Sequence, residues 1–218
     1  MAALMTVESN NTDKVISSIS ECRQMGIDVM APDVNESMDG FTARDGKIRF
    51  GLSGVKNVGG STVQAIIKAR EEGGKFESIF DFCQRVESRK LNRRTFESLV
   101  KSGAFDSFGV HRACLMESVD TLLSYTSLIQ KSSVEGQHSL FGQKESVTLP
   151  GLAEALEWTE KEILLNELDV LGFYVTSHPM AKYSRELSRS DVKDSEILSD
   201  ITEKTDITLA GVVRSLEI

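Results

Sequence analysis

Residues 50–70 read Phe50-Gly-Leu-Ser-Gly-Val-Lys-Asn-Val-Gly-Gly-Ser-Thr-Val-Gln-Ala-Ile-Ile-Lys-Ala-Arg70, a tight glycine-bearing turn between two short apolar segments of helical character. Val63, Ile66 and Ile67 follow the three-and-four spacing of a helix with one buried face, and Arg70 continues it. This order of helix, turn and helix is the sequence form of a helix-hairpin-helix.

The turn precedes a helix that we expect to begin near Ser61. The first N–H groups of a helix have no intrahelical acceptor, and the helix dipole adds partial positive charge there, so a phosphate oxygen is attracted. Val58 is the apolar side chain expected to hold the turn against its helices. Asn57 stands where the usual pattern has a glycine, and Asn tolerates a left-handed backbone. The candidate phosphate-binding residues are Lys56, Asn57, Val58, Gly59, Gly60 and Ser61.

This segment predicts binding of a sugar-phosphate backbone without regard to base sequence. The alternative is that Gly-Gly before an Ala- and Ile-rich helix is an ordinary helix start in a globular domain. The charge distribution bears on the choice. The whole chain is acidic, with 25 Lys and Arg against 33 Asp and Glu, but residues 44–116 contain 14 basic and 8 acidic residues. A basic block in an acidic chain is typical of a localised polyanion site, although a merely solvated charged surface also fits.

A second hairpin is predicted in the same block, with helices over 79–86 and 93–101. Asn92 is a good N-cap for the later helix, and Gly103 stands where a glycine would end it. Cations at a helix start oppose the dipole, so fold stability does not favour them there, whereas a bound phosphate would. The candidate phosphate-binding residues here are Lys90, Asn92, Arg93 and Arg94, with Arg89 beside them. Two hairpins in tandem can straddle a duplex across its minor groove.

Several runs along the chain resemble the alpha subunits of bacterial DNA polymerase III. They are Met1-Ala-Ala-Leu-Met-Thr6, Asn11-Thr-Asp-Lys-Val15, Glu21-Cys-Arg-Gln-Met-Gly26, Pro32-Asp-Val-Asn35, Ile48-Arg-Phe-Gly-Leu52, Phe80-Asp-Phe-Cys83, Arg89-Lys-Leu-Asn92, Gly103-Ala-Phe-Asp106, Leu171-Gly-Phe-Tyr-Val175 and His178-Pro179. The resemblance spans essentially the whole chain. It implies the end of a fingers domain, a tandem helix-hairpin-helix domain and the first strands of an oligonucleotide-binding (OB) fold.

The run Gly136-Gln-His-Ser-Leu-Phe-Gly142 lies outside any strong helical period. Gln137 offers a polar anchor, and Leu140 and Phe141 could each contribute about 1.5 to 3 kcal/mol on burial in a partner's cleft. The alternative is a loop that packs onto its own domain. The resemblance implies a sliding-clamp-binding motif, with Gln137, Ser139, Leu140 and Phe141 as the clamp-binding residues.

The predicted fold is mainly α. A tandem helix-hairpin-helix domain is flanked by a helical fingers remnant and by a helical segment that leads into a truncated β start of the OB fold. The predicted divisions are 1–43 (end of fingers), 44–118 (hairpins), 119–151 (helix and linker with the clamp motif), 152–190 (helical) and 191–218 (start of the OB fold).

Within these divisions, helices are expected over 13–25 and 110–130. Further on, an acidic amphipathic helix is expected to contain Leu156, Ile163, Leu164, Leu168 and Leu171, and a strand is expected over 206–218. Because that strand would be an unpaired edge, the chain is expected to be an excised part of a larger protein.

No catalytic residue and no metal ligand is assigned. Asp28, Asp33 and Asp39 lie in a loop-like stretch and are expected to be turn residues. The resemblance implies Mg²⁺ held by carboxylates upstream, in the full polymerase, and no cofactor in this fragment. The three cysteines, Cys22, Cys83 and Cys114, are widely separated and are expected to be reduced thiols in a cytoplasmic protein. The three histidines, His111, His138 and His178, are expected to be structural, and no secretion signal or membrane span is indicated.

The predicted function is therefore sequence-independent binding of primer-template duplex DNA, together with docking to the sliding clamp. Both would take place within a DNA-directed DNA polymerase (a nucleotidyltransferase) and its replicative holoenzyme, and the fragment alone should be inactive. Two alternatives remain open. A free-standing helix-hairpin-helix module of DNA repair or recombination would share the basic block. A protein-interaction scaffold would explain the acidic flanks and the peptide, but not the cations at two helix starts.

Overall fold

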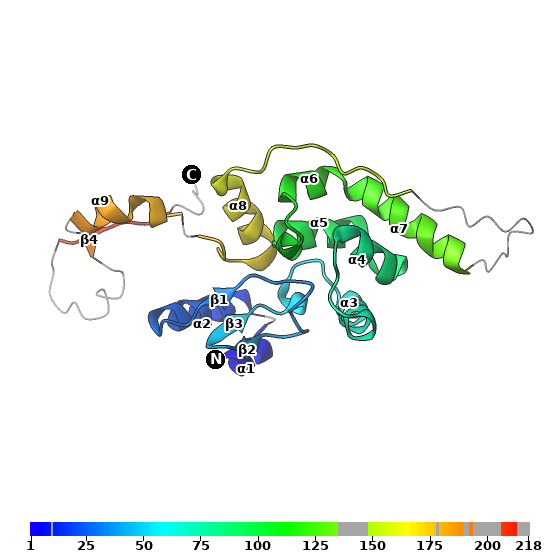
Figure 1. The fold of residues 1–218 in the computed structure, drawn as a ribbon. Helices are drawn as coiled ribbons and strands as arrows, with labels where there is room; N and C mark the ends of the chain where they lie inside the picture. The colour runs from blue at the N-terminus through cyan, green and yellow to red at the C-terminus, as the bar shows by residue number, and fades with distance from the viewer. Residues whose placement is uncertain (10, 135–147, 178, 190–191, 194–205, 213–218) are drawn as a thin grey trace, which may run out of the picture. The chain divides into compact units, whose positions relative to one another are not determined.

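The computed structural model describes residues 1–9, 11–134, 148–177, 179–189, 192–193 and 206–212. These residues divide into two compact units, Met1–Val175 and Thr176–Ile218 (Figure 1). The first unit is mainly helical, as the sequence predicts, with one small sheet. Among the described helices, none combines the length and the hydrophobicity that a membrane span requires.

The first unit opens with two helices and a three-stranded sheet. Helix α1 spans Ala2–Val7 and α2 spans Thr12–Gln24, and the strands are β1 (Val29–Met30), β2 (Thr42–Arg44) and β3 (Lys47–Arg49). The central strand β3 pairs parallel with β1 and antiparallel with β2. The helix predicted over 13–25 is confirmed, whereas α1 and the sheet were not predicted. Strands this short carry too few residues to show an alternating pattern.

The hairpin region follows the sheet. A 3₁₀ turn (Leu52–Gly54) leads to α3 (Gly60–Gly73), then to α4 (Ile79–Arg85), a second 3₁₀ turn (Ser88–Lys90) and α5 (Arg93–Lys101). The helices predicted from near Ser61, over 79–86 and over 93–101 are confirmed.

Helix α5 begins and ends as the sequence predicts. Gly103 has φ +79, its N–H donates to the Val100 carbonyl, and the next N–H, of Ala104, donates to the Leu99 carbonyl. These two bonds form a Schellman motif, which explains the glycine at this position.

Phenylalanine rings join the helices of the second hairpin. Phe82 of α4 lies 5.0 Å from Phe105, 5.2 Å from Phe76 and 6.4 Å from Phe96 of α5, measured between ring centroids. All four rings are at most 2 % exposed. Each buried ring contributes about 1.5 to 3 kcal/mol, so this cluster is what holds α4 against α5.

The remaining helices of the first unit are α6 (Arg112–Glu117), α7 (Val119–Val134) and α8 (Glu160–Leu171), and a 3₁₀ turn covers Asp106–Phe108. A single helix was predicted over 110–130, but it is interrupted at Ser118, between α6 and α7. Ser118 is buried, and its hydroxyl accepts a 2.8 Å hydrogen bond from the Ala153 N–H. That long-range contact, which sequence spacing does not reveal, joins the segment before α8 to the junction of α6 and α7.

The prediction that Leu156 belongs to the amphipathic helix is wrong. Leu156 precedes α8 and is 95 % exposed. Helix α8 starts four residues later because Thr159 and Glu162 form a capping box, in which each side chain bonds the other residue's backbone. Leu164 and Leu171 are buried as expected.

The second unit contains a 3₁₀ turn (Ala181–Tyr183), α9 (Ser184–Arg189) and the strands β4 (Val192–Lys193) and β5 (Thr208–Leu209). The two strands pair in parallel, with Val192 opposite Thr208. Strand β5 falls in the segment predicted to be a strand. The assignment of residues 191–218 to an OB fold, like the other domain boundaries, stays a prediction.

Candidate nucleic-acid interface

The first hairpin turn exposes backbone amides at the start of α3. Gly59 is the N-cap of α3 and supplies no capping side chain. Gly59, Gly60 and Ser61 are exposed, and among the described residues their N–H groups have no acceptor. The amides around them are used internally, because Val58 donates to the Val55 carbonyl and Val63 to the Gly59 carbonyl.

The backbone of this turn accounts for its unusual residues. Asn57 has φ +65, the left-handed conformation that Asn adopts more readily than most side chains. Gly59 and Gly60 have no such positive φ, and a Cβ on either would meet no atom within 4 Å. Neither backbone strain nor internal packing therefore requires these two glycines. What they leave is open space over the amides, into which a ligand can approach closely.

The second hairpin has a capped helix start. The Asn92 side chain accepts a 2.9 Å hydrogen bond from the Thr95 N–H, which confirms the predicted N-cap. The four cations predicted around it divide into two groups. Arg93 is paired, through Nε to Glu97 at 2.7 Å and through Nη1 to Asp120. Arg89, Lys90 and Arg94 make no ion pair within the described part of the chain.

Reciprocal hydrogen bonds join the two hairpins. The Thr95 hydroxyl donates to the Asn57 carbonyl at 2.8 Å, and the Thr62 hydroxyl donates to the Lys90 carbonyl at 2.8 Å. Asn57 Nδ2 also donates to the Ser98 hydroxyl at 3.1 Å. Each threonine is the third residue of its helix and bonds the turn of the other hairpin. The structure therefore brings the two predicted phosphate-binding turns together.

These joining residues were missed by sequence reasoning. The runs Gly59-Gly-Ser-Thr62 and Asn92-Arg-Arg-Thr95 place a threonine three residues after each N-cap. Both threonines are buried. This repeated offset is the signal that could have identified them.

Lys56 lies at the edge of the first hairpin and is shared with α8. Its Nζ lies 3.1 Å from Asp169 Oδ1, and its backbone N–H donates to the Val170 carbonyl at 2.9 Å. Asp169 Oδ2 is also 2.9 Å from Lys101 Nζ. Hydrogen bonds from Lys101 and Lys56 lower the pKa of the Asp169 carboxyl. Lys56 is thus held by an internal carboxylate, at a place where a phosphate could take over that role.

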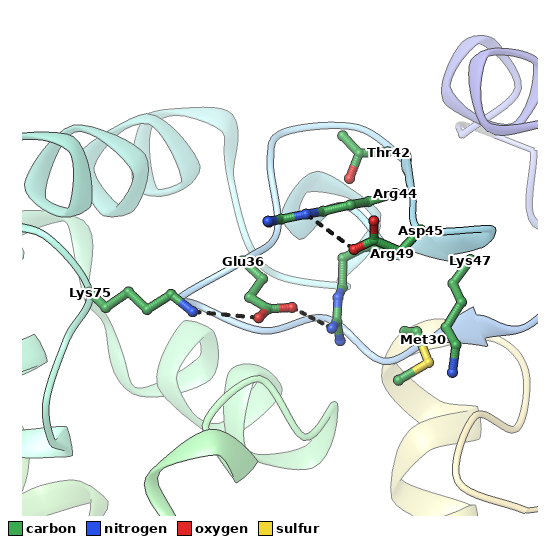
Figure 2. A pocket seen from close by; sticks show the side chains of 8 residues that line it. All are labelled: Met30, Glu36, Thr42, Arg44, Asp45, Lys47, Arg49 and Lys75. Carbon is green, nitrogen blue, oxygen red and sulfur yellow. Dashed lines mark hydrogen bonds and ion pairs between the residues drawn. The ribbon is translucent and has the colours of Figure 1, made fainter.

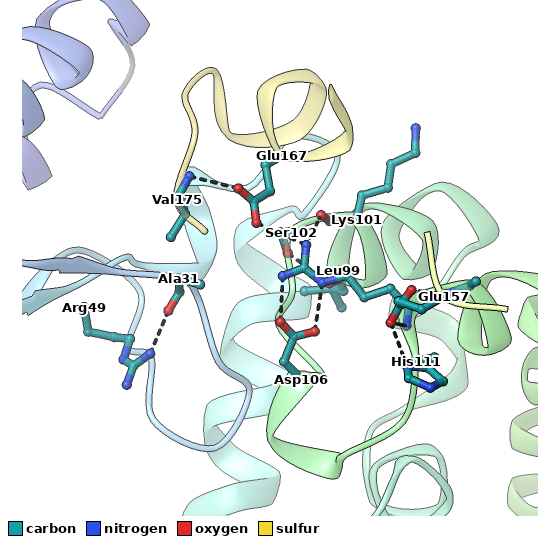
Figure 3. Close-up of polar contacts among 12 residues, drawn as sticks. Ala31, Arg49, Leu99, Lys101, Ser102, Asp106, His111, Glu157, Glu167 and Val175 are labelled. Atoms are coloured by element: carbon teal, nitrogen blue, oxygen red, sulfur yellow. Dashed lines mark hydrogen bonds and ion pairs between the residues drawn. The ribbon is translucent and has the colours of Figure 1, made fainter. Parts of the chain in front are cut away.

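A buried ionic network fixes the far side of α5 (Figure 3). The Arg112 guanidinium donates to both Asp106 oxygens, at 2.9 and 2.6 Å, and to Glu167 at 3.2 Å. Burial opposes the charge on Arg112, but these carboxylates outweigh it and raise its pKa. Glu167 is fully buried and also accepts the Val175 N–H at 2.9 Å. This network holds α6 and α8 against the hairpins, with Arg112 and Glu167 buried and the Asp106 side chain 46 % exposed.

The remaining candidate residues are the three cysteines and the predicted clamp-binding residues. Cys22 and Cys83 are buried and Cys114 partly so, and all three are free thiols. Burial raises the pKa of the Cys83 thiol to about 11, so the thiol stays protonated and unreactive. In the described residues, no three His, Cys, Asp or Glu side chains are grouped to hold a metal. The predicted clamp-binding residues Gln137, Ser139, Leu140 and Phe141 lie outside the described residues.

Comparison with known proteins agrees with this geometry. Residues 26–115, which include both hairpins, match the family described as helix-hairpin-helix motif. The chain is 41 % identical over 192 residues to a protein of Pasteurella multocida, 39 % over 217 residues to one of Haemophilus influenzae and 39 % over 193 residues to one of Escherichia coli. These alignments cover 86, 98 and 87 % of the chain, and each relative is named DNA polymerase III subunit alpha.

The resemblance predicted from the sequence is thereby confirmed. The chain spans 17 to 19 % of the length of these relatives.

Proposed function

We propose that the two hairpin turns together bind the sugar-phosphate backbone of duplex DNA without reading its base sequence. One observation carries the proposal: the N–H groups of Gly59, Gly60 and Ser61 are exposed and have no acceptor in the described residues. A helix start of this kind stabilises an anion through both hydrogen bonds and the dipole. Contacts of this type position DNA and carry no sequence information directly.

The two turns contribute differently to the proposed site. The first offers amides, and the second offers the cationic side chains of Arg89, Lys90 and Arg94 beside the Asn92 cap. The bonds of Thr62 and Thr95 fix the spacing between the turns before DNA arrives. A site that is already ordered loses less conformational entropy on binding, which favours affinity.

In this proposal the chain is part of a replicative DNA polymerase and grips the duplex during template-directed synthesis. The names of the relatives and the helix-hairpin-helix match support this assignment. Nucleotidyl transfer would use Mg²⁺ bound elsewhere in the full protein, and no catalytic residue is assigned to this chain. The isolated chain is expected to bind duplex DNA and to have no polymerase activity. The full protein is expected to act in the cytoplasm.

Docking to the sliding clamp is a separate part of the proposal. Gln137 would fix the peptide by hydrogen bonds, and Leu140 and Phe141, next to Ser139, would fill an apolar cleft of the clamp. Replacing Gln137 and Phe141 by Ala should abolish clamp binding and leave duplex affinity unchanged. An unchanged clamp affinity in that variant would contradict this part alone.

The DNA-binding proposal is tested by measuring duplex affinity across salt concentrations, for several unrelated sequences. A backbone contact predicts similar affinities for all sequences and a log-log salt slope of about −0.9 for each phosphate neutralised. Absence of duplex binding at low salt would favour an interaction scaffold instead. A strong sequence preference would contradict binding through the backbone alone.

A further inference from the structure

A basic pocket lies beside the small sheet, and none of the residues assigned above lines it (Figure 2). Its volume is about 380 Å³. It is lined by Met30, Glu36, Thr42, Arg44, Asp45, Lys47, Arg49 and Lys75. Four cations and two carboxylates give this surface a formal charge of +2, in a chain whose net charge is −8.

The strand register places three of the four cations on one face of the sheet. Thr42 pairs with Arg49 and Arg44 pairs with Lys47, while Ala43 pairs with Ile48 between them. Because side chains alternate along a strand, the first two pairs share a face and Ile48 points to the other. Ile48 is 3 % exposed and belongs to the core. The face formed by Thr42, Arg44, Lys47 and Arg49, here called the basic face, therefore points away from the core.

Folding alone does not favour the basic face. Arg44 and Lys47 are directly opposite each other, and like charges at opposed positions destabilise a ladder. Asp45 and Gly46, with φ +51 and +74, form the tight turn that fixes this register. The structure thus imposes a juxtaposition of cations that an anion would relieve.

The cations fall into an anchored pair and an available pair. Arg49 donates to the Ala31 carbonyl at 2.8 Å and to Glu36 at 2.5 Å, and Lys75 lies 3.6 Å from the same carboxylate. Glu36 thereby holds two cations that are distant in the sequence, Arg49 of β3 and Lys75, which follows α3.

The available pair is Arg44 and Lys47, whose side chains are 80 % and 51 % exposed. Their partners Asp45 and Asp28, at 3.5 and 3.2 Å, are 88 % and 69 % exposed. Ion pairs this exposed stabilise little, so a phosphate can displace these carboxylates.

We propose that the basic face binds the phosphate groups of a nucleic-acid strand, as a contact additional to the two hairpin turns. A strand fits better than a compact anion because the cations extend along the ladder, from the opposed Arg44 and Lys47 at one end to Arg49 at the other. Met30 is the single apolar side chain among the pocket-lining residues, so the site offers phosphate contacts and little to hold a base. The inference rests on the proposed function in one respect, that the ligand of this chain is DNA.

The test uses the double variant Arg44→Gln, Lys47→Gln in the full chain. Fluorescence anisotropy with a labelled duplex, at about 50 to 200 mM salt, should give a slope of log affinity against log salt that is smaller by about 1.8. The matched control removes two exposed cations elsewhere, by Lys14→Gln and Lys161→Gln, and should leave the slope unchanged. The thermal midpoint of the double variant should equal or exceed that of the wild type, because an opposed like-charge pair is gone.

Two further arms separate the possible failures. Ser61→Glu, at the first hairpin, should weaken duplex binding whether or not the basic face contributes, so its result reports on the proposed function alone. A wild-type slope in Arg44→Gln, Lys47→Gln, together with a loss in Ser61→Glu, would overturn this inference and leave the hairpin proposal standing. Saturable binding of dATP that the double variant loses, with an unchanged duplex slope, would also overturn it, since the pocket would then take a free nucleotide.

Discussion

The two hairpins meet through matching threonines but differ at their helix starts. Helix α3 begins at glycines, with no capping side chain and with exposed amides, and its neighbouring cation Lys56 is held by Asp169. Helix α5 begins at a side-chain cap. The first hairpin thus offers the amide dipoles of a helix start, and the second hairpin offers cationic side chains. In the proposed function, a single ligand, an anionic backbone, would account for features of both helix starts that fold stability alone does not favour.

The largest effect that tests the difference between the two helix starts is expected at Ser61. Ser61→Glu places a carboxylate among the exposed amides, which should stabilise α3 by about 0.3 to 1 kcal/mol through the dipole. The same charge repels phosphate, so duplex affinity should fall about tenfold or more. Thermal unfolding and anisotropy measure the two effects in the same sample.

The control for this variant is Ser124→Glu on α7, an exposed position remote from both turns. It adds the same charge and should change affinity much less. If Ser61→Glu were stabilising and bound duplex as well as Ser124→Glu does, the first turn would have no role in binding.

The cap of the second hairpin gives the next largest effect. Asn92→Ala removes the acceptor of the Thr95 N–H and should lower the free energy of unfolding by about 1 kcal/mol, measured by urea denaturation. Gly59→Ala, at the uncapped start, removes no side-chain bond and should cost less than Asn92→Ala, because glycine ranks below asparagine but above alanine at an N-cap. Equal losses in the two variants would show that the two helix starts are not different in kind.

Two adjacent arginines of the second hairpin, one paired within the described residues and the other not, test which cations contact DNA. Arg94→Gln removes a cation without an ion pair in the described residues and should reduce the salt slope by about 0.9. Arg93→Gln, its neighbour, removes a cation paired with Glu97 and Asp120 and should leave the slope nearly unchanged. The reverse ranking in anisotropy would mean that DNA draws Arg93 out of its ion pairs.

The smallest expected effect concerns Asp169. Asp169→Asn should release Lys56 toward phosphate and raise duplex affinity about twofold, since exposed pairs contribute little.

The pKa of the Asp169 carboxyl is lowered in the folded chain, so its contribution to stability is present above pH about 4 and is lost as the pH falls through the folded value. The stability difference between wild type and Asp169→Asn should therefore vanish under acid. A difference that persists at low pH would assign it to something other than this charge.

Much of the fold could be predicted because local signals agree with it. The helix that starts at Arg93, its Asn92 cap and its terminating Gly103 follow from propensity and capping within ten residues or so. Asn57 is accounted for by the left-handed conformation that its position requires.

What could not be predicted depends on distant contacts. Strand β1 pairs with β3 across 19 positions, Val29 with Ile48, and Ser118, where the predicted helix is interrupted, accepts a hydrogen bond from Ala153. At the candidate site, the pairing of Arg93 with Asp120 and of Lys56 with Asp169 is equally non-local. Charge counts alone could therefore indicate that cations gather near the turns, but not which of them are already neutralised.

The central claim is tested most directly by following backbone amide resonances while a short duplex is added to the ¹⁵N-labelled chain. The account predicts that the amides of Gly59, Gly60 and Ser61 shift together and saturate, and do so alike for two duplexes of unrelated sequence. Unshifted resonances at these three residues, under conditions where the duplex is bound, would contradict it.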